Sequence, residues 1–218
     1  YELEQELEAD EKFDRLDRVQ RIADLADIHY IRQKEREGLG DAVLYAQKHV
    51  GDEPFALLLG DTIIKSEVPC IESLISAAET HKSSVLSLER VPWEDVPSYG
   101  VADTDEVHPD MESFPVNDFV EKPSQEEAPS NLAITGRYVL TPEIFGLLDA
   151  TKKGVGGELQ LTDALRKLET ARGVELKGDR YDIGNIPSWI QANVDMALIH
   201  DDGEINTAVE AMIGDHIR

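Results

Sequence analysis

The stretch FALLLGDTII, residues 55–64, decides the fold class of this chain. Its apolar first half, 55–59, predicts a strand buried in a sheet, and Gly60 and Asp61 follow where that strand ends. The carboxyl end of a buried strand is where an open α/β sheet binds ligands and metal ions. The position of Asp61 therefore predicts a carboxylate that binds a metal ion, with an aspartate that only closes a turn as the alternative.

Strand and helix patterns alternate on both sides of this stretch. Apolar residues at three- and four-residue spacings indicate helices, and short apolar runs indicate strands. The expected helices are 1–27, 41–49 and 70–81, and the expected strands are 28–33, 55–59 and 84–90. This alternation predicts an α/β fold with a mixed, mostly parallel central sheet flanked by helices. Further β segments at 117–121 and 133–140 predict a β-rich insertion within a single domain over 1–218.

The composition fits a soluble globular protein with a core of its own. Of the 218 residues, 41% are hydrophobic, and no apolar run is long enough to span a membrane. The segment that begins at Tyr1 has neither the basic start nor the apolar core of a signal peptide. The single cysteine, Cys70, excludes an internal disulfide and a cysteine metal cluster, and it fits a reducing cytoplasm.

The charge balance is strongly acidic. Lysine and arginine number 21 against 45 for aspartate and glutamate, and the net charge is −24. A field of this sign repels nucleic acid and anionic membranes, so we expect neither as a partner. The acidic residues are dispersed along the chain, which is typical of proteins kept soluble at very high salt. A halophilic source is one interpretation, and an ordinary acidic cytosolic protein is the other.

Two polar clusters follow later strands. In the first, 121–123, Lys122 offers a point charge to a phosphate and Glu121 can accept hydrogen bonds from sugar hydroxyls. In the second, 181–185, Asp182 offers a second carboxylate to the same metal ion. Taken alone, the first cluster also suits a surface ion pair, and Asp182 suits a turn residue better than a ligand.

Four further positions have the chemistry to bind a nucleotide or a sugar. The carboxamide of Gln33 presents a donor beside an acceptor, as the edge of a pyrimidine requires, and Gly38 lets its backbone approach a flat ring. Gly100 and Asn131 offer backbone and amide groups to sugar hydroxyls. Ordinary turn and strand roles explain each of these positions equally well when it is taken alone.

In chain order, these pieces form one series. Its members are 31–33, 38–42, 51–54, 59–61, 99–101, 120–123, 129–140, 158–164 and 181–185. The series closely resembles the bacterial-type UTP–glucose-1-phosphate uridylyltransferases, also called UDP-glucose pyrophosphorylases, of the sugar nucleotidyltransferase superfamily. The resemblance runs from about Tyr1 to Ile199, and the runs 130–140 and 158–164 are specific to this branch. It implies a Rossmann-like nucleotidyltransferase fold.

The resemblance implies a role for each matched position. The implied contacts are Gln33 and Gly38 with uracil, Gly100 and Glu121 with glucose, Lys122 with the sugar phosphate, and Asn131 and Glu158 with the sugar side. Asp61 and Asp182 are implied to hold Mg²⁺, and Asp61 and Lys122 are implied to be catalytic.

The implied reaction joins UTP and glucose 1-phosphate to give UDP-glucose and pyrophosphate. The implied setting is the cytoplasm, in a homodimer or homotetramer.

One family motif has no match in residues 1–30, namely the glycine-rich loop that wraps the triphosphate. We therefore expect an N-terminally truncated chain that lacks the first strand and is inactive as it stands. The alternatives are a related enzyme that uses dTTP or another sugar, and a non-catalytic nucleotide-sugar-binding module. Residues 201–218 predict a C-terminal helix that serves oligomerisation or packs on its own domain, with an apolar face formed by Ile205, Val209, Met212 and Ile213.

Overall fold

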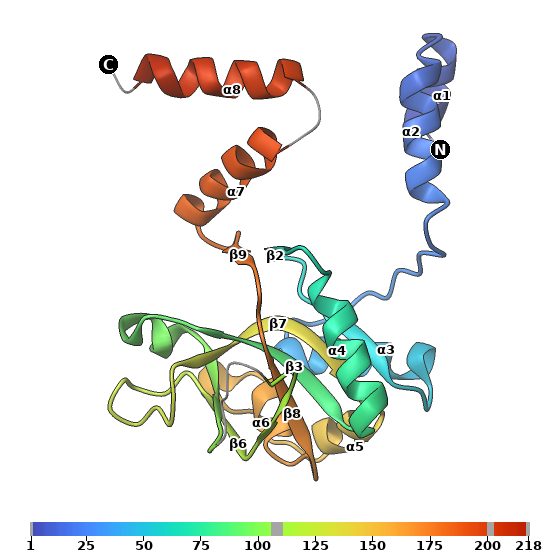
Figure 1. Ribbon diagram of the computed structural model, residues 1–218. Helices are drawn as coiled ribbons and strands as arrows, with labels where there is room; N and C mark the ends of the chain where they lie inside the picture. The colour runs from blue at the N-terminus through green and yellow to red at the C-terminus, as the bar shows by residue number, and fades with distance from the viewer. Residues whose placement is uncertain (1, 106–110, 200–202, 217–218) are drawn as a thin grey trace. The chain divides into compact units, whose positions relative to one another are not determined.

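The computed structural model describes residues 2–105, 111–199 and 203–216. The chain divides into two units, Tyr1–Lys34 and Glu35–Arg218, and each is described by itself. Figure 1 labels the helices and strands of both units.

The first unit contains two helices, α1 (Glu2–Ala9) and α2 (Phe13–Ala23). The helix expected over 1–27 is thus interrupted, and Glu11 in the interruption has a φ of 56°. The strand expected over 28–33 is wrong, because none of these residues is in a strand and Tyr30 is 91% exposed. An apolar run becomes a strand only where a neighbouring strand satisfies its backbone hydrogen bonds.

A seven-stranded sheet lies at the centre of the described part of the second unit. Its strands are β1 (Phe55–Leu58), β3 (Ser84–Arg90), β4 (Gly100–Asp103), β5 (Phe114–Val116), β6 (Asp118–Glu121), β7 (Leu132–Leu140) and β8 (Ala171–Glu175). They lie in the order β5-β8-β3-β7-β4-β6, and β1 pairs with β7. Strands are therefore confirmed where they were expected at 55–59, 84–90, 117–121 and 133–140, whereas the expected strand 174–181 is wrong, because β8 ends at Glu175 and Asp179 begins a strand of another sheet.

The long strand β7 decides the strand directions. One of its edges pairs with β3, and the other pairs with β1 at Phe55↔Leu140 and with β4 at Val101↔Ala133, all antiparallel. Among the described strands of this sheet, β3 and β8 form the one parallel pair. The sheet is mixed, as expected, but the expectation of a mostly parallel sheet is wrong. The alternation of β1, α4 and β3 does make β1 and β3 run in the same direction, but β7 lies between them.

Helices cover both faces of the sheet, because alternate strand residues point to opposite faces. On one face, Leu74 of α4 packs against Val85 and Val139. On the other face, α3, α5 and α6 pack against a cluster that includes Leu86 and Tyr138 (Figure 1). The covering helices are α3 (Leu39–Val50), α4 (Cys70–His81), α5 (Glu143–Asp149) and α6 (Leu161–Leu165). Each fully buried apolar side chain contributes roughly 1.5–3 kcal/mol to stability.

A separate two-stranded sheet pairs β2 (Thr62–Lys65) with β9 (Asp179–Asp182). The chain then continues into α7 (Ile186–Ile199) and α8 (Gly203–His216). The expected C-terminal helix is thus present at 203–216, whereas 201, 202, 217, 218 and the side chain of Ile213 lie outside the description. Its role in oligomerisation stays a prediction. Two short 3-10 helices, Trp93–Ser98 and Val155–Gly157, lie in the connections.

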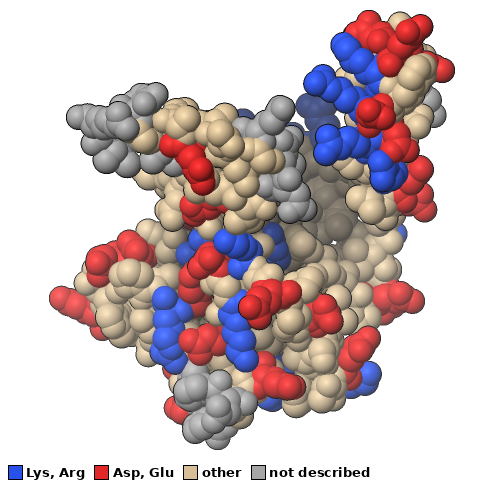
Figure 2. Space-filling view, turned by 45° about the horizontal axis from the view of Figure 1, so that its top comes forward, with Lys and Arg blue, Asp and Glu red and all other residues tan. Residues whose placement is uncertain are grey.

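Acidic and basic side chains are mixed on the one face that Figure 2 shows. On the face drawn in Figure 2, Asp and Glu are interspersed with Lys and Arg and do not form a single patch. None of the described helices is both long and apolar enough to cross a membrane. The interpretation of the acid excess as an adaptation to high salt stays a prediction.

Candidate functional site

Asp61 lies in the turn between β1 and β2, at the carboxyl end of β1, as the sequence predicted. The amide of Thr62 donates to the carbonyl of Leu59 at 3.3 Å, which makes 59–62 a hydrogen-bonded β-turn. The amide of Leu59 in turn donates to the carbonyl of Gly136 on β7 at 3.0 Å. The side chain of Asp61 is exposed. Its carboxylate therefore projects from a turn whose backbone is bonded to the central strand of the sheet.

Asp182 lies beside Asp61, although the two are far apart in the sequence. The pairing of β2 with β9 places Asp182 opposite Thr62, and the amide of Ile183 donates to the carbonyl of Asp61 at 2.9 Å. Both carboxylates border Gly184, since a β-carbon on that glycine would lie 3.1 Å from Asp182 Oδ1 and 3.9 Å from Asp61 Oδ2. The two-stranded sheet thus brings together the two carboxylates that the sequence predicted as partners.

Groups of three residues surround the Asp182 carboxylate. The amide of Gly184 donates to Oδ1 at 3.1 Å, and the hydroxyl of Tyr99 lies 3.5 Å from Oδ2. Arg180 Nη1 lies 4.0 Å from the same Oδ2, while its Nε donates to Glu89 Oε2 at 2.5 Å. The guanidinium also lies over the ring of Tyr99, 4.9 Å from its centroid. Tyr99 and Arg180 therefore hold one carboxylate of the pair in place.

The converging carboxylates fit a hard divalent cation. Mg²⁺ is commonly bound through one or two protein carboxylates, and water and substrate phosphates complete its octahedron. Asp61 and Asp182 supply this type of ligand, whereas zinc prefers nitrogen and sulfur ligands. Within the described residues, His, Cys, Asp and Glu form no cluster of three or more that would hold a metal. The donor set therefore fits a magnesium ion that keeps open positions for phosphate.

Gly100, Glu121 and Lys122 meet where β4 pairs with β6. Gly100 lies opposite Glu121, and a β-carbon on Gly100 would lie 3.0 Å from both Glu121 Oε2 and Thr162 Oγ1. The Glu121 side chain is 11% exposed, whereas that of Lys122 is 48% exposed, with Nζ 3.9 Å from Glu121 Oε1. The φ of Lys122 is 45°, and its amide donates to the carbonyl of Tyr99 at 3.0 Å. The Glu121 carboxylate and the Thr162 hydroxyl thus lie close to a glycine whose position has no space for a larger side chain, and the Lys122 ammonium group lies beside that carboxylate.

Tyr99 connects these two halves of the site. Its hydroxyl lies 3.5 Å from Asp182 Oδ2, and its carbonyl accepts the amide of Lys122 at 3.0 Å. Tyr138 is buried on β7, and burial, followed by the negative charges of Glu121 and Asp61, raises the pKa of its phenol. The phenol therefore stays neutral at physiological pH.

Gly38 and Glu158 lie against each other in the second unit. A β-carbon on Gly38, whose φ is 112°, would lie 2.8 Å from Glu158 Cβ and 2.7 Å from the carbonyl oxygen of Leu159. The amide of Gly40 donates to that same carbonyl at 2.9 Å. Both the backbone conformation and the close approach therefore require glycine at position 38.

Two predicted site residues have other surroundings. Gln33 belongs to the first unit, where it is half-buried, and its contact with uracil stays a prediction. The carboxamide of Asn131 donates to the carbonyl of Val91 at 2.8 Å, and the amide of Val91 donates to the carbonyl of Asn131 at 3.0 Å. Asn131 thus ties the start of β7 to the segment after β3, and its contact with a sugar stays a prediction.

Comparison with known proteins shows the family. The family model described as nucleotidyl transferase matches residues 2–198. The chain belongs to this nucleotidyl transferase family. A UTP–glucose-1-phosphate uridylyltransferase of Bacillus subtilis is 45% identical to it over 200 residues, which cover 90% of this chain and 68% of that protein. UTP–glucose-1-phosphate uridylyltransferase 2 of Staphylococcus saprophyticus is 44% identical over 208 residues, which cover 92% and 71%.

Solved structures agree with this nucleotidyl transferase assignment. UDP-glucose pyrophosphorylase from Acinetobacter baumannii superposes with a TM-score of 0.85 at 31% identity, and the match covers 98% of this chain and 75% of that one. A UDP-glucose pyrophosphorylase complexed with UDP-glucose superposes with a TM-score of 0.77 at 38% identity, covering 84% and 70%. The family and the Rossmann-like fold that the motifs predicted are therefore confirmed.

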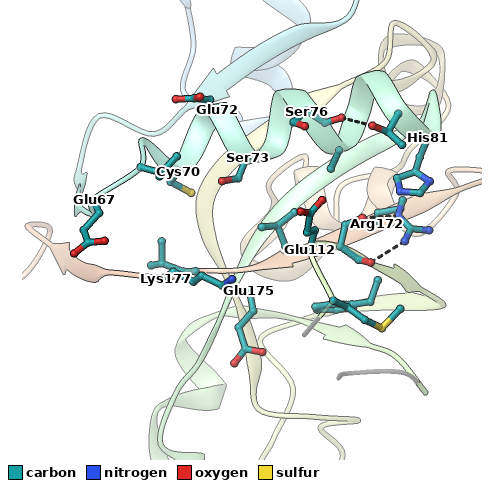
Figure 3. A pocket seen from close by; sticks show the side chains of 18 of the residues that line it. Glu67, Cys70, Glu72, Ser73, Ser76, His81, Glu112, Arg172, Glu175 and Lys177 are labelled. Atoms are coloured by element: carbon teal, nitrogen blue, oxygen red, sulfur yellow. Dashed lines mark hydrogen bonds between the residues drawn. The ribbon is translucent and has the colours of Figure 1, made fainter. Parts of the chain in front are cut away.

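This nucleotidyl transferase also has a cavity between α4 and β8 (Figure 3). This α4–β8 cavity has a volume of about 1160 Å³, and none of the site residues predicted from the sequence lines it. Two of its polar residues, Arg172 and Cys70, are bonded to neighbouring groups. Arg172 Nε donates to Ser113 Oγ at 3.0 Å, Arg172 Nη2 donates to the Ser113 carbonyl at 2.8 Å, and Cys70 donates to Ser87 Oγ at 3.3 Å. This cavity thus differs from the place where the predicted residues meet.

The structure adds four residues to the site of this nucleotidyl transferase: Tyr99, Thr162, Arg137 and Arg180. The first three lie inside the runs 99–101, 158–164 and 130–140, and Arg180 directly precedes the run 181–185. Their place in or next to these runs was the only sign in the sequence that they belong to the site. It did not show what the side chains do, because their partners lie on distant segments of the chain.

Proposed function

We propose that this nucleotidyl transferase moves a uridylyl group from UTP to glucose 1-phosphate, which yields UDP-glucose and pyrophosphate. The observation that carries this proposal is that Tyr99 contacts both halves of the site, through its hydroxyl near Asp182 and its carbonyl on the amide of Lys122. One half consists of the carboxylates of Asp61 and Asp182, and the other of Glu121 with Lys122, opposite Gly100. The names of the relatives refer to the same substrates, and a structural neighbour at 38% identity is complexed with UDP-glucose.

The chemistry needs positioning and charge compensation more than covalent work by the protein. A phosphate oxygen of glucose 1-phosphate attacks the α-phosphorus of UTP. The new P–O bond forms as the bond to the bridging oxygen of the β-phosphate breaks, and pyrophosphate leaves with the electron pair. Lys122 offsets charge on the sugar phosphate, and Glu121 accepts hydrogen bonds from sugar hydroxyls.

Magnesium is the cofactor that this proposal includes. Asp61 and Asp182 would be its protein ligands, because their carboxylates converge at Gly184. When bound, the ion neutralises phosphate charge in the transition state. The chain itself contributes a fixed turn under Asp61, and it contributes the amide of Gly184 and the hydroxyl of Tyr99 around Asp182. The cytoplasmic location and the homo-oligomeric state stay predictions.

A panel of nucleotides and sugar 1-phosphates tests the proposal on the complete protein, with pyrophosphate release as the measurement. UTP with glucose 1-phosphate should give the highest kcat/KM. A preference for dTTP or for another sugar phosphate would contradict the proposed substrates, and absence of turnover with every pair would favour a binding module.

The same assay tests the role of Lys122. Lys122→Ala should lower kcat/KM by about 100-fold or more, because a charge aimed at a transferring phosphate is lost. Lys48→Ala is the matched control, since Lys48 is exposed on α3. Near-normal rates for Lys122→Ala would remove this lysine from the mechanism.

A further inference from the structure

We infer that Arg137 is a positioning residue, which sets the orientation of the Asp61 carboxylate and thereby the affinity of the site for a divalent cation. This inference rests on the proposed function, because it concerns one of the two proposed metal ligands. Arg137 lies on β7, is half-buried and has no proposed contact with either substrate.

The guanidinium of Arg137 binds both ends of the turn that carries Asp61. Nη1 donates to the carbonyl of Leu59 at 3.0 Å, and Nη2 donates to the carbonyl of Thr62 at 2.5 Å. Nη1 also lies 3.2 Å from the carbonyl of Gly136. Leu59 and Thr62 are the first and last residues of the β-turn, and Asp61 is its third. One side chain therefore fixes the backbone on both sides of Asp61.

The contacts of Arg137 with the carbonyls of Leu59 and Thr62 form a clamp on the turn, and this clamp requires an arginine. A planar guanidinium presents several N–H donors in fixed directions, so it can bind two carbonyls that lie apart, whereas a lysine ammonium is a compact charge on a flexible stem. The turn also fits closely on β7 beneath it. A β-carbon on Gly136, whose φ is 80°, would lie 3.1 Å from both Leu59 Cδ1 and Thr62 Oγ1.

The clamp acts on the metal ligands through the partner strand. Thr62 pairs with Asp182, and the carbonyl of Asp61 accepts the amide of Ile183. A turn that shifts on β7 therefore changes the distance between the Asp61 and Asp182 carboxylates. Groups that orient metal ligands without touching the ion commonly change metal affinity by roughly 10- to 100-fold when they are removed.

The test compares Arg137→Lys with Arg172→Lys. Arg172 is a matched control because its guanidinium also forms a fork on one backbone carbonyl and one neighbouring group, at Ser113 in the α4–β8 cavity. Both substitutions keep the positive charge and remove the pair of guanidinium N–H donors. Binding of Mn²⁺ to the complete protein without nucleotide is measured by electron paramagnetic resonance, and hydrogen exchange is measured over residues 55–65 and 171–177.

Arg137→Lys should weaken Mn²⁺ binding about tenfold or more and speed exchange at 55–65. Arg172→Lys should bind Mn²⁺ like the wild type and speed exchange only at 171–177. Wild-type Mn²⁺ affinity in a folded Arg137→Lys protein overturns the inference, and so does equal weakening in both variants.

Gly136→Ala is the second variant, in case Arg137→Lys does not fold. It disturbs the same turn with the arginine intact, and an unchanged Mn²⁺ affinity there also overturns the inference. If the wild type binds no Mn²⁺, the inference fails together with the metal site. Uridylyl transfer is judged separately by the nucleotide panel, so the two failures remain distinguishable.

Discussion

The end of the sheet that carries Asp61 and the α4–β8 cavity differ in how their acidic groups are arranged. In the cavity, Glu175 pairs with Arg90, and Arg172 binds Ser113. At the end of the sheet, in contrast, the carboxylates of Asp61 and Asp182 converge, since a β-carbon on Gly184 would lie 3.9 Å from the first and 3.1 Å from the second. Converging carboxylates are the type of ligand that a divalent cation such as Mg²⁺ prefers. The convergence of carboxylates, rather than volume, therefore indicates the site.

The largest expected effect comes from removing one of the converging charges. Asp182→Asn keeps the shape of the side chain but halves the charge available to a divalent cation, so kcat/KM should fall by about 100-fold or more. Initial rates at several Mg²⁺ concentrations measure this loss. The matched control is Glu72→Gln, an acid of α4 that lines the cavity, which should keep the wild-type rate. Similar losses in both variants would remove the distinction between the two regions.

A smaller effect is expected from filling the space at Gly100. Gly100→Ala should raise the KM for glucose 1-phosphate roughly tenfold, because the new methyl group lies 3.0 Å from both Glu121 Oε2 and Thr162 Oγ1. Steady-state kinetics with the sugar phosphate varied measure it. Gly146→Ala on α5 is the control, since no atom lies within 4 Å of a β-carbon there, and it should leave KM unchanged. An unaltered KM in Gly100→Ala would place the sugar elsewhere.

The smallest effect concerns Cys70, which lines the α4–β8 cavity. Burial raises the pKa of this thiol above its ordinary value of 9.0, although the bond to Ser87 and the charge of Arg137 act in the opposite direction. Because only the thiolate reacts, alkylation by iodoacetamide at pH 8 should be several-fold slower than for a free thiol, and its rate should still rise above pH 9. Mass spectrometry over time measures the rate. A fast reaction that levels off below pH 8 would indicate an activated cysteine and a chemical role for the cavity.

Much of the candidate site could be predicted from the sequence, because the chemistry of each group is local. Asp61 follows an apolar run, and Lys122 follows the strand that ends at Glu121. The chemistry of these side chains and their place at a strand end could therefore be predicted from the same short segment. Gly38 and Gly100 are required by close approaches of Glu158 and Glu121, which agrees with their place in motifs. A local pattern does not show whether such a residue also has a structural partner, as Asn131 has in Val91.

The errors share one physical cause. The run 28–33 has strand-like composition, but none of the strands that the structure describes pairs with it. The order of β1, α4 and β3 suggested parallel neighbours, but β7, from much later in the chain, lies between them. In both cases the outcome depends on a partner that is distant in sequence or missing, and local propensity does not encode that partner.

The sequence by itself determined the family, the α/β class and the kinds of groups that the site contains, because motifs and periodicity are properties of short segments. Only the tertiary structure decided the strand directions, the meeting of Asp61 with Asp182 across β2 and β9, and the clamp of Arg137 on the turn of Asp61. Each of these depends on strand order and register, which place distant residues within a few ångströms of one another.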